Sequence, residues 1–131
     1  MKILLDTHII LWTLTDSEKL SKKARQIILN PNNHIFYSVV SMWEISIKHS
    51  KNPEKLNISG SMFMHYCEQS GFCKLPLDDR HITTLETLEQ NPNHNDPFDR
   101  ILLSQAKADS MLFLTHDHKF SFYDEPYVAI V

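Results

Sequence analysis

Two hydrophobic patterns alternate along this chain of 131 residues. Short, wholly apolar runs predict buried strands, and segments with apolar residues at every third or fourth position predict helices that face a core. The predicted strands cover residues 3–5, 34–38, 73–75, 111–114 and 127–130. The predicted helices cover residues 7–15, 17–29, 38–51, 60–71, 79–90 and 97–108. This order predicts an α/β fold, with a largely parallel central sheet and helices on both faces.

Turn residues fix several of these boundaries. Clusters rich in Asn and Pro at 30–33, 52–53 and 91–97 separate the periodic segments. Ser17 and Ser21 are both available as N-caps of the second helix. The chain contains no repeat and no linker, so we expect residues 1–131 to form one domain.

The composition is that of an ordinary globular protein, with 42% hydrophobic and 22% charged residues. The formal net charge of −3 means that nucleic-acid binding would require a local basic patch. Cys67 and Cys73 lack the spacing of a metal site, which suits a reducing compartment, and we expect both to pack in the interior. No apolar run is long enough for a signal peptide or a membrane span, so the sequence predicts a cytoplasmic protein.

Two acids directly follow predicted buried strands. Asp6 ends the run Ile3-Leu4-Leu5, and Asp117 follows the strand at 111–114. Ligands of open parallel sheets collect at the carboxyl ends of the strands, so we expect both side chains at one edge of the sheet. Each also has an ordinary structural explanation, since Asp6 can cap the next helix and Asp117 can belong to a turn.

Two further acids lie on the apolar faces of predicted helices. Glu44 has Val40 four residues before it, and Asp99 has Leu102 and Leu103 three and four residues after it. A lone buried carboxylate is costly. The structural alternatives are a capping box of Ser41 with Glu44, and stabilisation of Asp99 by the positive end of its helix.

Four carboxylates that converge from two strand ends and two helix faces would repel one another unless a cation lay between them. Carboxylate ligands suit Mg²⁺, with Mn²⁺ as a possible substitute. We therefore expect Asp6, Glu44, Asp99 and Asp117 to bind the metal and to act in catalysis. The chemistry implied is phosphodiester hydrolysis by a metal-activated water.

The motifs Leu5-Asp6-Thr7, Ser41-x-x-Glu44, Asp96-Pro97-Phe98-Asp99-Arg100 and Leu114-Thr115-His116-Asp117-x-x-Phe120 follow one another along the chain. In this order they resemble PIN-domain nucleases, and more narrowly the toxins of VapBC-type toxin–antitoxin pairs. The resemblance extends from Met1 to the last predicted strand.

The resemblance implies a PIN-like three-layer α/β/α fold and a Mg²⁺-dependent endoribonuclease that cleaves RNA. It also implies a cognate antitoxin protein that blocks the site, and a homodimer. It assigns the metal and catalytic roles to the same four acids, and it suggests that the hydroxyl of Thr115 supports a ligand or positions water. Asp96 is an extra acid one turn before Asp99, and its place before Pro97 predicts a helix N-cap.

For the other histidine, basic and aromatic side chains we expect ordinary structural roles. His94, His116 and His118 lack the ligand spacing of a zinc site, and we expect surface histidines that are either near an RNA groove or simply solvated. The segment Lys48-His49-x-Lys51 is either a basic rim of the site or an ordinary solvated helix face, and the solvated face is also our expectation for Arg100. The large aromatic residues are expected in the core, namely Trp12, Trp43, Phe98 and Phe113.

Two other functions remain open on the sequence. A phosphatase that forms an aspartyl-phosphate also places Asp at the end of the first strand, but it commonly has a second acid two residues later, where this chain has His8. The other alternative is an RNA- or protein-binding module without catalytic activity on the same fold.

Overall fold

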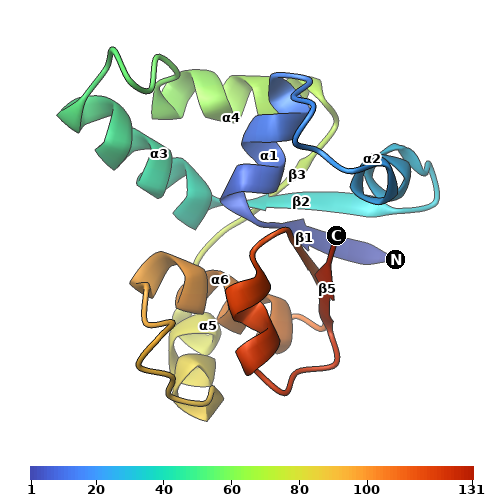
Figure 1. Ribbon diagram of the computed structural model, residues 1–131, viewed down its shortest axis with the longest axis vertical. Helices are drawn as coiled ribbons and strands as arrows, with labels where there is room; N and C mark the ends of the chain where they lie inside the picture. The colour runs from blue at the N-terminus through green and yellow to red at the C-terminus, as the bar shows by residue number, and fades with distance from the viewer.

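The computed structural model describes residues 1–131 and contains one five-stranded sheet (Figure 1). The strand order is β3-β2-β1-β4-β5, and each neighbouring pair is parallel. The predicted fold class is therefore confirmed, with every strand parallel. The strands are β1 (Lys2–Leu5), β2 (His34–Ser38), β3 (Cys73–Leu75), β4 (Leu112–Thr115) and β5 (Val128–Ile130).

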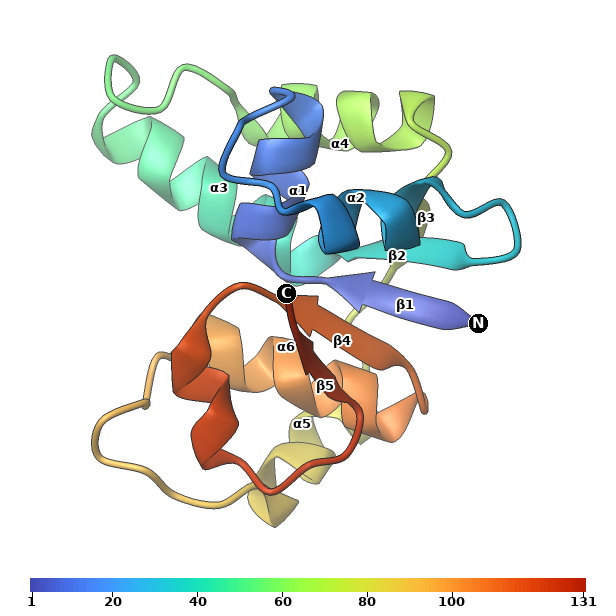
Figure 2. The same ribbon diagram turned by 45° about the vertical axis from the view of Figure 1, so that its right-hand side comes forward.

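Helices cover both faces of this sheet (Figure 2). They are α1 (Thr7–Leu14), α2 (Lys22–Leu29), α3 (Val39–Lys51), α4 (Gly60–Gln69), α5 (Asp79–Thr84) and α6 (Pro97–Ala108), with the 3₁₀ turns η1 (Leu85–Thr87) and η2 (His118–Phe122). The first four helices lie above the sheet in Figure 2, and α5, α6 and η2 lie below it. None of the helices combines the length and the hydrophobicity needed to cross a bilayer.

The layers follow from the alternation of side chains along β1. Ile3 and Leu5 belong to one hydrophobic cluster, together with side chains of α1, α2 and α4. Leu4 belongs to a second cluster, together with side chains of α6 and η2. Successive residues of a strand point to opposite faces, so an apolar run of this kind is buried on both sides. The result is an α/β/α arrangement with two cores.

Two predicted helices are shorter in the structure. The second helix begins at Lys22, because Ser21 is its N-cap and accepts a hydrogen bond from the backbone N–H of Ala24 at 3.1 Å. The region predicted as a helix over 79–90 forms α5 and then only the short turn η1. The predicted start at residue 17 is therefore wrong, although Ser21 was one of the two predicted N-caps. The prediction of one helix over 79–90 is wrong, whereas the helix over 97–108 is confirmed.

Some burial predictions were also wrong. The side chain of Trp43 is 57% exposed at the surface of α3, where its ring contacts Phe98 edge-on. Cys73 is exposed, while Cys67 is buried as expected. Arg100 was expected on a solvated helix face, but it is only 7% exposed. Its guanidinium donates to the carbonyl oxygen of Glu89 and to the hydroxyl of Tyr123.

Candidate metal centre

The neighbouring strands β1 and β4 bring the first and last acids to one edge of the sheet, since Leu5 pairs with Leu114. Asp6 follows β1 and is only 4% exposed. Its Oδ1 accepts a hydrogen bond from the backbone N–H of Thr7 at 2.7 Å, and its Oδ2 accepts one from the hydroxyl of Thr115 at 2.6 Å. Asp6 is therefore the N-cap of α1 and also a buried carboxylate at the end of a strand.

Asp117 is tied to the same threonine. Its backbone N–H donates to Oγ1 of Thr115 at 3.0 Å, and its Oδ1 accepts from the backbone N–H of Lys119 at 2.9 Å. Asp117 thereby caps η2, which is the turn role foreseen for it. The hydroxyl of Thr115 therefore connects the two acids at the strand ends.

Glu44 reaches this edge from α3. The N-cap of α3 is Ser38, so the alternative of a capping box that begins at Ser41 is wrong. One carboxylate oxygen of Glu44 accepts a hydrogen bond from Oγ1 of Thr7 at 2.9 Å, and the other accepts one from Nζ of Lys48, also at 2.9 Å. Oγ1 of Thr7 also lies 2.8 Å from Oγ of Ser41. Thr7 therefore joins the first turn of α1 to the glutamate on α3.

Asp99 lies in the first turn of α6. Asp96 is the exposed N-cap of this helix, and its side chain accepts a hydrogen bond from the backbone N–H of Asp99 at 3.0 Å. The capping role predicted for Asp96 is thus confirmed. The carboxylate of Asp99 contacts Nε2 of His94 at 3.0 Å. His94 is only 3% exposed, and its ring packs against Phe120 and Tyr123.

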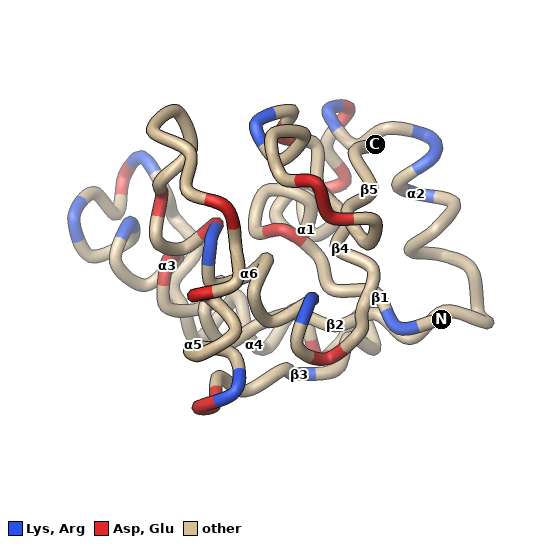
Figure 3. The backbone as a smooth tube through the Cα atoms, turned by 90° about the horizontal axis from the view of Figure 1, so that it is seen from below, with Lys and Arg blue, Asp and Glu red and all other residues tan.

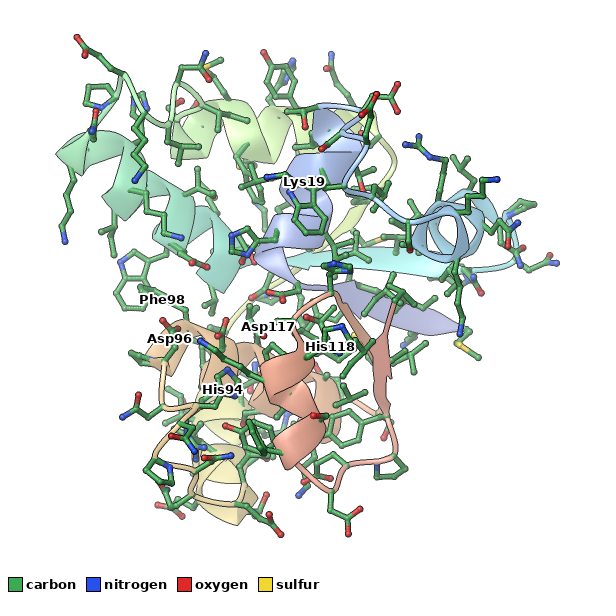
Figure 4. All side chains as sticks on the ribbon, in the orientation of Figure 1. Lys19, His94, Asp96, Phe98, Asp117 and His118 are labelled. Atoms are coloured by element: carbon green, nitrogen blue, oxygen red, sulfur yellow. The ribbon has the colours of Figure 1, made fainter.

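His94, Asp99 and Asp117 form one cluster, with one potential ligand atom from each within 4.8 Å of the others. Figure 4 shows His94 and Asp117 facing the space between the lower ends of α1 and α3 and the start of α6. His94 is predicted to lie at the surface, and its burial next to the acids differs from that prediction. The only indication in the sequence that His94 lies near the site is its position in the turn just before α6.

The acids also interact electrostatically. The pKa of Asp6 is raised to about 7, mainly by burial and also by the negative charges of Asp99 and Glu44, against hydrogen bonds from Thr115 and Thr7 that lower it. Burial likewise raises the pKa of Asp99, with contributions from Asp96 and Glu44, while the contact with His94 lowers it. Asp6, Glu44 and Asp99 are therefore close enough to repel one another as anions.

Protein cations leave most of this charge unbalanced. No lysine or arginine nitrogen lies within 4.0 Å of Asp6, Asp99 or Asp117, and Lys48 pairs only with Glu44. A set of hard carboxylate oxygens with uncompensated charge fits a divalent cation such as Mg²⁺ or Mn²⁺. Nε2 of His94 is engaged by Asp99, which is the arrangement of a histidine that orients a ligand rather than one that binds a metal itself.

Comparisons with known proteins agree with this architecture. The family model of the PIN domain matches residues 3–126. No curated protein matches the chain in sequence. Among solved structures, VapBC2 of Rickettsia felis bound to a promoter DNA fragment has a chain with a TM-score of 0.71 and 19% identity, covering 100% of this chain and 98% of that one.

Two more solved structures have the same fold. DNA-bound VapBC of Salmonella typhimurium has a chain with a TM-score of 0.68 and 17% identity, covering 100% of this chain and 97% of that one. VapBC-1 of nontypeable Haemophilus influenzae has a chain with a TM-score of 0.61 and 17% identity, covering 91% of this chain and 89% of that one. At these identities the likeness establishes the fold.

Proposed function

The chain belongs to the PIN domain family, and on this premise we propose that it is a divalent-metal-dependent endoribonuclease whose 131 residues form one catalytic domain. The observation that carries the proposal is the convergence of largely buried carboxylates that repel one another, of which only Glu44 has a lysine partner. Such a cluster is costly to the metal-free fold, which is typical of sites selected for function.

Asp6, Glu44, Asp99 and Asp117 are the residues that would hold Mg²⁺ or Mn²⁺. The ion, when bound, supplies a Lewis acid that favours ionisation of water and neutralises charge on a phosphodiester. The protein supplies the orientation of the ligands. Thr115 orients Oδ2 of Asp6, and Nε2 of His94 orients Oδ2 of Asp99.

Thr7 and Lys48 orient Glu44 in a similar way. The hydroxyl of Thr7 directs one carboxylate oxygen, and the ammonium group of Lys48 neutralises the other. Because Lys48 is exposed, its side chain is free to exchange Glu44 for a phosphate oxygen when a substrate arrives. This exchange leaves Glu44 available to a cation.

We further propose that the chain is the toxin of a VapBC-like pair. The three solved structures described above are VapBC assemblies, two of them with DNA. The proposal includes a cognate antitoxin that blocks the acidic site, a homodimer, and an RNA substrate met in the cytoplasm.

The test is incubation of purified protein, free of antitoxin, with a pool of cellular RNA in Mg²⁺, in Mn²⁺ and in EDTA. We expect discrete fragments with either metal and none in EDTA. Asp99→Asn should abolish cleavage, because it removes a ligand charge.

Asp96→Asn is the matched control. It removes the same charge three residues away, and Asn remains a good N-cap, so cleavage should persist. Intact RNA under every condition, from folded protein, would contradict the proposal. In that case, phosphate release from a small monoester would identify a phosphatase, and binding of RNA without cleavage would identify a binding module.

A further inference from the structure

A cavity of about 460 Å³ opens between α1 and the end of α3, beside the acidic site. Three apolar side chains form part of its wall: Leu11 of α1, Ile45 of α3 and Leu56 of the loop that follows. The volume lies in the range of ordinary small-molecule sites. The cavity therefore has the size and the partly apolar wall needed to hold a group such as a nucleoside.

The rest of the wall is basic. Lys48, Lys51 and Lys55 line the cavity, and all three are exposed. Neither Lys51 nor Lys55 has a carboxylate oxygen within 4.0 Å. Figure 3 shows Lys and Arg positions, in blue, around α3 and the loop beyond it. In a chain with a net charge of −3, this is the local basic patch that nucleic-acid binding requires.

The cavity borders the candidate metal centre through two of its lining residues. Lys48 lines the cavity and donates to Glu44 at 2.9 Å, so one side chain belongs to both. His8 also lines the cavity, and it follows Thr7, whose hydroxyl bonds to the same glutamate. An anionic chain bound at the acids would thus extend directly to the lysines.

We propose that this cavity binds the nucleotide next to the scissile bond of a single-stranded RNA, with its phosphate at Lys51 and Lys55 and its nucleoside on the apolar wall. This inference rests on the proposed ribonuclease function and names a substrate subsite for it. A phosphate alone would use the lysines but not Leu11, Ile45 and Leu56. An unstacked nucleotide uses both kinds of side chain, and single-stranded RNA presents its bases in that way.

The test compares two double variants with the same change in charge. Lys51→Ala/Lys55→Ala removes the cavity lysines and leaves Lys48, which contacts Glu44, in place. Lys22→Ala/Lys23→Ala removes two exposed lysines of α2 that have no carboxylate partner and lie away from α3 (Figure 1). Both proteins are checked for folding by circular dichroism.

Binding of a fluorescent single-stranded RNA oligonucleotide is measured by anisotropy in EDTA over a series of salt concentrations. Repulsion by the acids is common to all three proteins, so it cancels in the comparison. The cavity variant should bind about tenfold more weakly than wild type at low salt. The slope of log K against log salt concentration should be smaller by about 0.7, because the one phosphate held by these two lysines is no longer neutralised. The α2 variant should bind as wild type does.

Cleavage in Mg²⁺ completes the test. The cavity variant should raise KM and leave kcat nearly unchanged. Equal binding by wild type and the cavity variant, or equal losses in both double variants, would overturn the subsite. RNA binding that depends on Lys51 and Lys55 without any cleavage by wild type would retain the RNA-binding cavity and reject the nuclease instead.

Discussion

The hydroxyl oxygen of Thr115 lies 2.6 Å from Oδ2 of Asp6, although the two residues are 109 positions apart in the sequence. The same oxygen accepts the backbone N–H of Asp117 at 3.0 Å. One threonine at the end of β4 therefore orients the acid that follows β1 and the acid that follows its own strand. The geometry of the site depends on the parallel pairing of these strands.

Thr115→Val should reduce cleavage more than it reduces stability. The valine has a similar shape, but it removes a donor to Asp6 and an acceptor for Asp117. We expect a loss of about 10- to 100-fold in activity or metal affinity and of about 1–3 kcal/mol in the free energy of unfolding. Initial rates over a Mg²⁺ titration and urea unfolding check the two numbers. Thr115→Ser keeps the hydroxyl and should retain most of the activity; equal activity in Val and Ser variants would contradict this role.

The placement of the acids could be predicted because it follows from periodicity and topology. An apolar run that ends in an acid places Asp6 at the edge of a parallel sheet, and the same reasoning applies to Asp117. Glu44 and Asp99 could be placed on inward helix faces from their neighbours three and four residues away. These relationships are local in sequence, and the order of the strands brings them together.

The environment of His94 could not be predicted in this way. It lies in an irregular segment without periodicity, and the fold of that segment depends on distant contacts. Tyr123 donates to the carbonyl oxygen of His94, and the buried Arg100 binds both Tyr123 and Glu89. Nothing in the sequence near His94 specifies these partners, so burial of the histidine and of Arg100 was missed.

His94→Phe should lower activity without lowering stability. The phenyl ring preserves the packing against Phe120 and Tyr123, but it loses the contact with Asp99. Nδ1 of His94 is buried without a hydrogen-bond partner, so the replacement also removes an unsatisfied polar atom. We expect a loss of about 10- to 100-fold in activity with an unchanged or higher Tm.

A conservative replacement separates positioning from packing at this residue. His94→Gln carries an amide N–H that can still donate to Asp99, so it should recover part of the activity and require less Mg²⁺ for half-maximal rate than the Phe variant. If the Phe variant kept full activity, or if its loss of activity followed a fall in Tm, a positioning role for His94 would be rejected.

Gly60→Ala should destabilise the packing of α4 on α3. A Cβ at Gly60 would lie 1.9 Å from Oγ of Ser46 and 3.2 Å from its Cβ. To make room, Ser46 must give up its hydrogen bond to the carbonyl oxygen of Met42 and move. We expect a loss of about 1–3 kcal/mol, which is the usual range for overpacking, measured by urea unfolding. In a Ser46→Ala background the same change should cost less; equal costs in both backgrounds would exclude this contact as the cause.

The metal-free protein should lose stability as the pH rises toward neutrality. The folded pKa of Asp6 is raised to about 7, above the ordinary value of 3.8. Between these two values the folded state binds more protons than the unfolded state, so the free energy of unfolding falls with rising pH. A pKa difference of this size corresponds to a change of about 2–4 kcal/mol in the free energy of unfolding. The raised pKa of Asp99 acts in the same direction. Thermal melts in EDTA at pH 5.5 and pH 8 measure the change.

Asp6→Asn tests whether this residue causes the pH dependence, because it removes the charge and keeps an oxygen that can accept the N–H of Thr7. The variant should be at least as stable as wild type at pH 8 in EDTA, and its Tm should change less between pH 5.5 and 8. Mg²⁺ should raise the Tm of wild type at pH 8 and have little effect on the variant, since a ligand that binds only the folded state stabilises it. A variant that is less stable than wild type at pH 8 would mean that the carboxylate of Asp6 serves the fold as a cap. A stable variant that has lost its response to Mg²⁺ would mean that the carboxylate of Asp6 destabilises the metal-free fold by charge repulsion and serves to bind the cation.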